Sequence, residues 1–146
     1  MTPKRPCRVL LVEDNPADVR LLQEAFRESK EPHEIHTVAD GEQAIEFVYR
    51  RNGYADKPRP DLVLLDINLP KRSGHDVLAA VKNEPKLRSI PVVMLTSSKS
   101  PKDITAAYDG HANAYLQKPT ELAEYFDVVA TVKQFWLDMV ELPTAA

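Results

Sequence analysis

The chain has 146 residues, of which 43% are hydrophobic and 28% are charged, with a formal net charge of −3 at pH 7. These values are typical of a soluble globular protein of one domain, and they exclude the basic face that nucleic-acid binding usually needs. No apolar run approaches the ~18 residues of a membrane span, and no signal peptide is visible, so we expect a cytoplasmic protein without a membrane partner.

The first half of the chain alternates between apolar runs and segments with helical spacing. Residues 8–12 predict a buried strand, and Asn15-Pro16 marks the start of a helix that runs to about residue 29. Residues 34–39 give a weaker strand signal. Residues 40–43 resemble a capping box, which opens a second helix that ends near residue 51. A polar loop follows, up to residue 60.

The second half begins with four apolar residues, 62–65, that run straight into Asp66. Such a run predicts a strand buried on both faces. Ser73 is the expected cap of a third helix, and residues 90–95 predict a fourth strand. The remaining segments predict a helix opened by residues 100–103, a strand at 112–117 and a last helix from 120 to about 137.

This order of strand then helix, repeated five times, predicts a single α/β domain over residues 1–146. We place its core at about 8–137 and a tail at 138–146. The pattern favours a five-stranded parallel sheet with helices on both faces and right-handed crossovers. A flavodoxin-like strand order, 2-1-3-4-5, would make the first and third strands neighbours at the topological switch point.

Polar side chains follow four of the five predicted strands. Glu13 and Asp14 follow the first strand, Asp66 the third, Thr96 the fourth and Lys118 the fifth. Taken singly, each is better explained as an acidic helix start or a turn residue. Their joint occurrence favours a shared pocket, because the carboxyl ends of parallel strands meet at one edge of the sheet.

The residue types in this pocket point to phosphoryl chemistry. Crowded carboxylates repel one another unless a cation is present, and Mg²⁺ prefers oxygen ligands of this kind. Lys118 offers a compact positive charge, and the hydroxyl of Thr96 offers a donor. Asp66 would then be a nucleophile that forms an aspartyl phosphate.

With these residues assembled, the chain resembles the receiver domain of two-component response regulators. The motifs that carry the resemblance are residues 10–14, 64–70, 73–74, 96–98 and 115–119, in order and spacing over about residues 8–137.

The resemblance implies that a histidine kinase phosphorylates Asp66, and that Lys118 and Thr96 grip the phosphoryl group. It further implies that Mg²⁺ is held by Asp14, Asp66 and the backbone carbonyl of Asn68, with Glu13 acting through water. Tyr115 would be the switch aromatic coupled to Thr96, and the Lys118–Pro119 peptide bond would be cis.

A narrower similarity is to the small single-domain regulators paired with bacterial phytochrome kinases. It rests on the loop at 54–60, the segment 112–116 and the ending at 135–137 with Leu142-Pro143. It implies a phytochrome kinase as the partner. The four histidines are scattered and without ligand-like neighbours, so we assign them structural or surface roles.

Two other functions compete with the phosphorylated switch. A small phosphohydrolase with an aspartyl-phosphate intermediate would often carry an Asp two residues after the nucleophile, where this chain has Asn68. A pseudo-receiver would bind partners without phosphorylation, and its mark would be the loss of an acidic or lysine position. Neither mark is present, so a non-enzymatic switch is the leading hypothesis.

The last helix carries more apolar surface than one packing face needs. Its apolar residues cover about half of the circumference, broader than the ~100° stripe that packs onto a core. We therefore expect a homodimer through this helix and the tail, unless the tail folds back over the surplus. The expected interface consists of Tyr125, Val128, Val132, Phe135, Trp136 and Met139.

Overall fold

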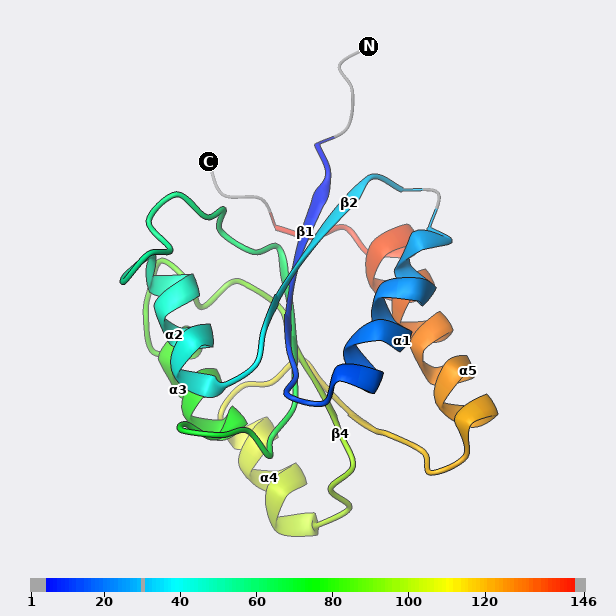
Figure 1. Ribbon diagram of the computed structural model, residues 1–146. Helices are drawn as coiled ribbons and strands as arrows, with labels where there is room; N and C mark the ends of the chain where they lie inside the picture. The colour runs from blue at the N-terminus through cyan, green and yellow to red at the C-terminus, as the bar shows by residue number, and fades with distance from the viewer. Residues whose placement is uncertain (1–4, 30, 144–146) are drawn as a thin grey trace.

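The computed structural model describes residues 5–29 and 31–143, which form a parallel sheet with helices on both faces (Figure 1). The strand order is β2-β1-β3-β4-β5, which confirms the predicted flavodoxin-like order. The strands are β1 (Cys7–Val12), β2 (His33–Val38), β3 (Leu62–Leu65), β4 (Val92–Thr96) and β5 (Ala114–Gln117). The helices are α1 (Pro16–Arg27), α2 (Gly41–Tyr49), α3 (Gly74–Lys82), α4 (Pro101–Asp109) and α5 (Leu122–Lys133), followed by the π-helix η1 (Gln134–Met139).

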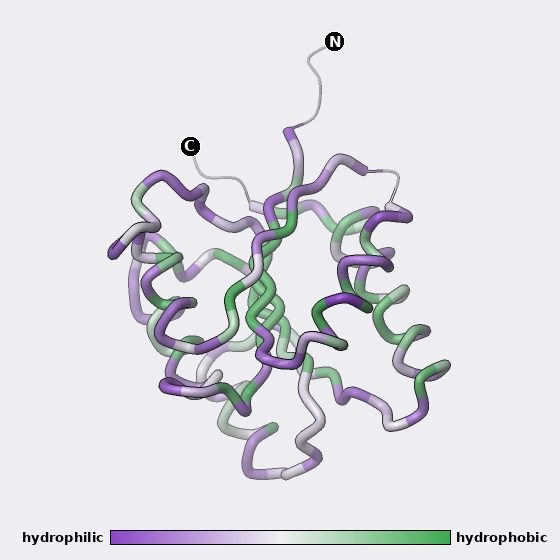
Figure 2. The backbone as a smooth tube through the Cα atoms, in the orientation of Figure 1, coloured by the Kyte–Doolittle hydropathy of each residue, from purple (hydrophilic) through white to green (hydrophobic). Residues whose placement is uncertain are grey.

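The core lies in two layers, one on each face of the sheet. Along β1, Val9 and Leu11 pack toward α1 and α5, whereas Leu10 and Val12 pack toward α2 and α3. The strands consequently form the hydrophobic centre of the molecule in Figure 2, between helices in which hydrophobic and hydrophilic residues are mixed. Burial on both faces explains the continuous apolar runs of β1, β3 and β4. Among the described residues, no helix is long and apolar enough to cross a membrane.

The predicted starts of α1, α3 and α4 are confirmed by their caps, whereas α5 begins at Leu122, two residues later than expected. The side chain of Asn15 accepts hydrogen bonds from two backbone N–H groups of α1, and Ser73 and Ser100 do the same for one N–H group each of α3 and α4. The first two helices end two residues earlier than expected. In α2 the reason is Arg50, whose left-handed backbone (φ 58°) terminates the helix.

The last helix differs from the expected regular helix to residue 137. The α-helix ends at Lys133 and widens into η1, where the N–H of Val140 donates to the carbonyl of Phe135 at 2.8 Å, five residues back. Spacing arguments based on 100° per residue therefore fail beyond Lys133.

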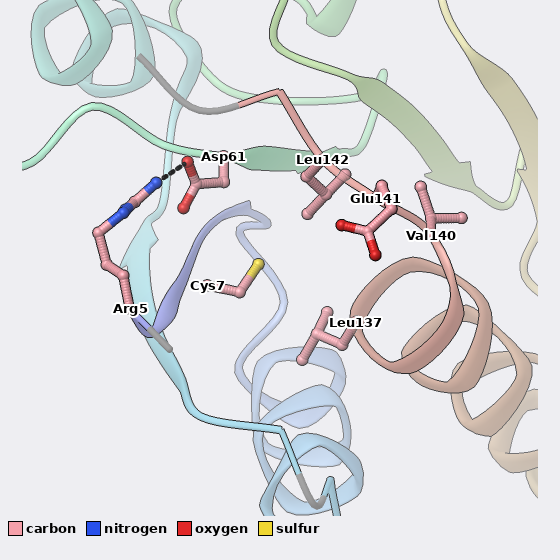
Figure 3. Close-up of a pocket in the computed structure, with 7 residues that line it drawn as sticks. All are labelled: Arg5, Cys7, Asp61, Leu137, Val140, Glu141 and Leu142. Carbon is pink, nitrogen blue, oxygen red and sulfur yellow. Dashed lines mark hydrogen bonds and ion pairs between the residues drawn. The ribbon is translucent and has the colours of Figure 1, made fainter. Parts of the chain in front are cut away.

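The segment after η1 folds back toward the sheet. Leu137 is buried and Leu142 is half-buried, and both pack in the layer formed with α1 and α5. Figure 3 shows these two side chains and Cys7 around a hollow at the starting ends of β1 and β3, about 170 Å³ in volume. The alternative is that the tail folds back and covers the apolar surplus of the last helix; Leu142 does pack against the core, but Phe135 and Met139 stay exposed.

Candidate functional site

Backbone hydrogen bonds fix three of the strand-end residues at one edge of the sheet. The N–H groups of Glu13, Asp66 and Lys118 donate to carbonyls of the neighbouring strands, at 3.1, 3.1 and 2.7 Å. Glu13, Asp66, Thr96 and Lys118 are buried, and Asp14 is exposed. The side chains of Glu13, Asp14, Asp66 and Lys118 therefore converge as predicted, and Thr96 ends the neighbouring strand β4.

Lys118 lies at the centre of the site. Its Nζ donates to Glu13 Oε1, to Asp18 Oδ2 at 2.9 Å and to Asp66 Oδ2 at 3.2 Å. Burial acts to lower the pKa of Lys118, but the hydrogen bonds to Glu13 and Asp18 and the charge of Asp66 raise it above its ordinary value. Lys118 therefore stays charged. For Glu13, burial raises the pKa, and the hydrogen bond from Lys118 lowers it by a smaller amount.

Asp18 is a site residue that sequence reasoning missed. It lies in the first turn of α1, where an acidic residue is expected simply because it suits the helix dipole. The signal that could have identified it is its position in the first turn of α1, three residues after the capping Asn15, which directly follows Asp14.

The expectation of a cis bond between Lys118 and Pro119 is wrong, because this peptide bond is trans. The long side chain of Lys118 reaches Asp66 from a trans backbone, which is the intrinsically preferred form.

The loop after β3 holds the carboxylate of Asp66 in place. Its Oδ1 accepts the N–H of Ile67 at 2.7 Å and that of Asn68 at 3.4 Å. The loop closes where the N–H of Gly74 donates to the carbonyl of Ile67 at 2.8 Å. A Cβ at Gly74 would lie only 2.2 Å from the carbonyl oxygen of Asp66, so glycine is required by this close approach.

Three carboxylates of the site are close enough to share a metal ion. One oxygen each of Glu13, Asp14 and Asp66 lies within 4.8 Å of the others. A set of hard oxygen donors fits a divalent cation such as Mg²⁺ or Mn²⁺. Asn68 lies two residues after Asp66, and its backbone carbonyl remains a predicted ligand of the metal ion.

Thr96 and Tyr115 are linked through a third residue. Thr96 is fully buried, and its Oγ1 accepts the N–H of Ser98 at 3.4 Å. The hydroxyl of Tyr115 donates to the carbonyl of Ser98 at 3.0 Å. Ser98, which sequence reasoning treated only as part of a motif, is the bridge between the two predicted switch residues.

The predicted dimer interface needs a correction. Tyr125 and Val132 are buried, at 6% and 2% exposure, because they pack against the sheet in the layer shared with α1. They cannot lie at an interface between two chains. Of the other expected members, Phe135 and Met139 are 47% and 66% exposed, and Val128 and Trp136 are half-buried.

Comparisons with known proteins agree with this geometry. Residues 9–130 match the model of the response regulator receiver domain. The chain is 45% identical over 140 residues to the response regulator Rcp1 of Synechocystis sp., covering 96% of this chain and 95% of that protein.

Two solved structures are similar over nearly their whole length. The Mn²⁺-bound form of Rcp1 has a TM-score of 0.94 at 45% identity, over 95% of this chain and all of that chain. The phosphorylated cyanobacterial phytochrome response regulator RcpA has a TM-score of 0.93 at 45% identity, over 96% of this chain and all of that chain.

Proposed function

Because this chain belongs to the response regulator receiver domain family, we propose that it is a phosphorylation switch with Asp66 as its phosphoacceptor. The observation that carries the proposal is the placement of Asp66. Its buried carboxylate lies between the ammonium of Lys118 and the oxygens of Glu13 and Asp14. A nucleophilic oxygen thus lies beside one fixed cation, the ammonium of Lys118, and beside carboxylate oxygens suited to bind a second cation, a metal ion.

The proposed reaction transfers a phosphoryl group from the histidine of a kinase. A carboxylate oxygen of Asp66 attacks the phosphorus, the P–O bond forms, and the P–N bond breaks with its electron pair returning to the imidazole. Lys118 offsets the negative charge of the phosphoryl oxygens, and the hydroxyl of Thr96 donates a hydrogen bond to one of them. The same residues would take part in the later hydrolysis of the aspartyl phosphate.

We assign the metal to Asp14 and Asp66, with Glu13 acting through water and the carbonyl of Asn68 completing the protein ligands. When bound, Mg²⁺ would neutralise the charge on the transferring phosphoryl group. The Mn²⁺-bound structure of the similar Rcp1 and the carboxylate cluster both support this assignment.

The pathway we propose is a phytochrome-type light response. Support comes from the similarity to Rcp1 and to the phytochrome regulator RcpA, which this chain matches along nearly its full length. The partner would be a phytochrome histidine kinase in the cytoplasm, and the output would be binding to other proteins. The slightly negative net charge supports a function without nucleic acid or a membrane surface.

Mass measurement after incubation with Mg²⁺ and acetyl phosphate tests this function. A stable adduct of one phosphoryl group is expected. Steady turnover of the donor without an adduct would instead indicate a phosphohydrolase. Neither adduct nor turnover would indicate a pseudo-receiver.

We also propose a homodimer through η1 and the end of α5. Two of the six exposed large hydrophobic side chains among the described residues, Phe135 and Met139, lie on η1. Phe135 stacks edge-on against Trp136, with ring centroids 5.4 Å apart. Aromatic residues and methionine are enriched at the centres of interfaces, so we centre the interface on Phe135, Trp136 and Met139, flanked by Val128.

The double substitution Phe135→Ser/Met139→Ser should weaken dimerisation by at least tenfold, because it removes two exposed apolar side chains without opening the core. Sedimentation at micromolar concentration measures this. Leu122→Ser is the matched control, since Leu122 is equally apolar and 71% exposed but lies at the other end of α5. A wild type that is monomeric, with or without phosphorylation, contradicts the proposal.

A further inference from the structure

A cluster of polar side chains outside the phosphorylation site connects three elements. Asp103 lies in the first turn of α4, where its own N–H donates to the capping Ser100. One carboxylate oxygen of Asp103 accepts the hydroxyl of Ser98 at 2.6 Å, and the other lies 3.2 Å from Nε2 of His75 on α3. Asp103 therefore joins the loop between β4 and α4 to helix α3.

The carboxylate of Asp103 is well suited to this role. The hydrogen bonds from Ser98 and His75 lower the pKa of Asp103, so it stays a charged acceptor. Asp103 and His75 are each about 30% exposed, which shields both hydrogen bonds partly from water. An acidic residue whose only role was to interact with the helix dipole would have its carboxylate oxygens open to solvent. Both carboxylate oxygens of Asp103 instead have hydrogen-bond partners.

Ser98 connects this cluster to the predicted switch residues. Besides its bond to Asp103, it donates its N–H to Thr96 Oγ1 and accepts the hydroxyl of Tyr115 at its carbonyl. In the proposed switch, Thr96 moves toward Asp66 to give its hydroxyl to a phosphoryl oxygen. Ser98, only two residues further, must then follow Thr96 or lose its bond to it. If Ser98 follows, its hydrogen bond to Asp103 is strained; if Asp103 holds Ser98 in place, the bond to Thr96 is lost. In both cases the contact between Ser98 and Asp103 opposes the movement of Thr96.

We propose that Asp103 and His75 are positioning residues of the switch, which hold the β4–α4 loop in its resting position and oppose the phosphorylation-driven movement of Thr96. This inference rests on the proposed phosphorylation of Asp66. It also gives His75 a more specific role than the structural or surface role that the sequence suggested.

Affinity for beryllofluoride, a phosphoryl mimic, in the presence of Mg²⁺ tests the proposal. Asp103→Ala should tighten binding about tenfold, the factor expected for one lost charge-assisted hydrogen bond that favours the resting state. His75→Ala should tighten it by a smaller factor, about threefold, because Ser98 still reaches Asp103. His75→Gln retains a donor and should bind like the wild type.

The chain offers a matched control in Asp76. It occupies the same capped position in the first turn of α3, with its N–H donating to Ser73, but its carboxylate pairs with Arg72, which directly precedes the capping residue. Asp76→Ala should leave the affinity for beryllofluoride unchanged. In a Thr96→Ala background, Asp103→Ala should also have no effect, because the residue that transmits the movement is gone.

Three results would overturn the proposal. The first is an unchanged or weakened affinity in both Asp103→Ala and His75→Ala. The second is a tightening of the same size in the Thr96→Ala background. The third is a wild type that binds no beryllofluoride and forms no phosphoryl adduct, which would refute the function of Asp66 itself. If Asp103→Ala fails to fold, as judged by thermal unfolding, the two His75 variants decide the question.

Discussion

Asp66→Asn should abolish phosphorylation of this chain while leaving it folded. The amide has the shape of the carboxylate but lacks the negative charge that attacks phosphorus. The ammonium of Lys118 contacts the carboxylates of Glu13, Asp18 and Asp66, and the carboxylate of Asp14 lies beside those of Glu13 and Asp66. Removing one of them lowers their mutual repulsion, so the metal-free variant should be at least as stable as the wild type. Mass measurement with a phosphodonor and denaturant unfolding check the two outcomes.

Asp61 provides a control for Asp66→Asn, because it directly precedes β3, the strand that Asp66 follows. Asp61 is buried and precedes β3, where it accepts Arg5 at 2.8 Å and the N–H of Arg8 at 2.9 Å. Asp61→Asn should be phosphorylated like the wild type but lose about 1–2 kcal/mol of stability, because it weakens a charge-assisted hydrogen bond. The two variants should therefore show opposite patterns. A phosphoryl adduct on Asp66→Asn at the wild-type rate would show that another residue is the acceptor.

The parts of the site that the sequence predicts are those attached to the sheet. A strand buried on both faces leaves an unmistakable apolar run, and the residue that follows it is fixed by the backbone. Asp66 could be located in this way, whereas Lys118 follows the half-buried strand β5, which is located by its order in the alternation of strands and helices. Each of the two residues extends the ladder of its strand by one hydrogen bond. The strand order follows from the alternation of strands and helices together with the handedness of the crossovers.

The parts of the site that the sequence does not predict depend on side chains that lie on helices, outside the sheet. Asp18 and Asp103 sit in first turns of helices, where acidic residues are common without any partner. Tyr125 and Val132 were misassigned because the apolar arc of α5 does not say which side meets the sheet. No residue type in the sequence marks the position at which the α-helix widens into η1.

Lys118→Met should destabilise the metal-free protein by about 3–5 kcal/mol, the cost of leaving buried charges without their partner. Methionine has a similar length and fits the same space, so the change isolates the charge. Glu13 and Asp66 are 3% and 7% exposed, and in the variant neither would have a neighbouring cation. Mg²⁺ should restore more stability to the variant than to the wild type, because it would bind to a more negative site. A site saturated at ~100 times its Kd gains about 2.7 kcal/mol. Unfolding in guanidinium chloride, with EDTA or with Mg²⁺, measures both effects.

Lys133→Met is the matched control, since Lys133 makes one ion pair with Asp138 at 3.9 Å, and its loss should cost no more than about 0.5 kcal/mol. If Lys118→Met equals the wild type in EDTA and gains nothing extra from Mg²⁺, the ammonium of Lys118 is not what holds these carboxylates together.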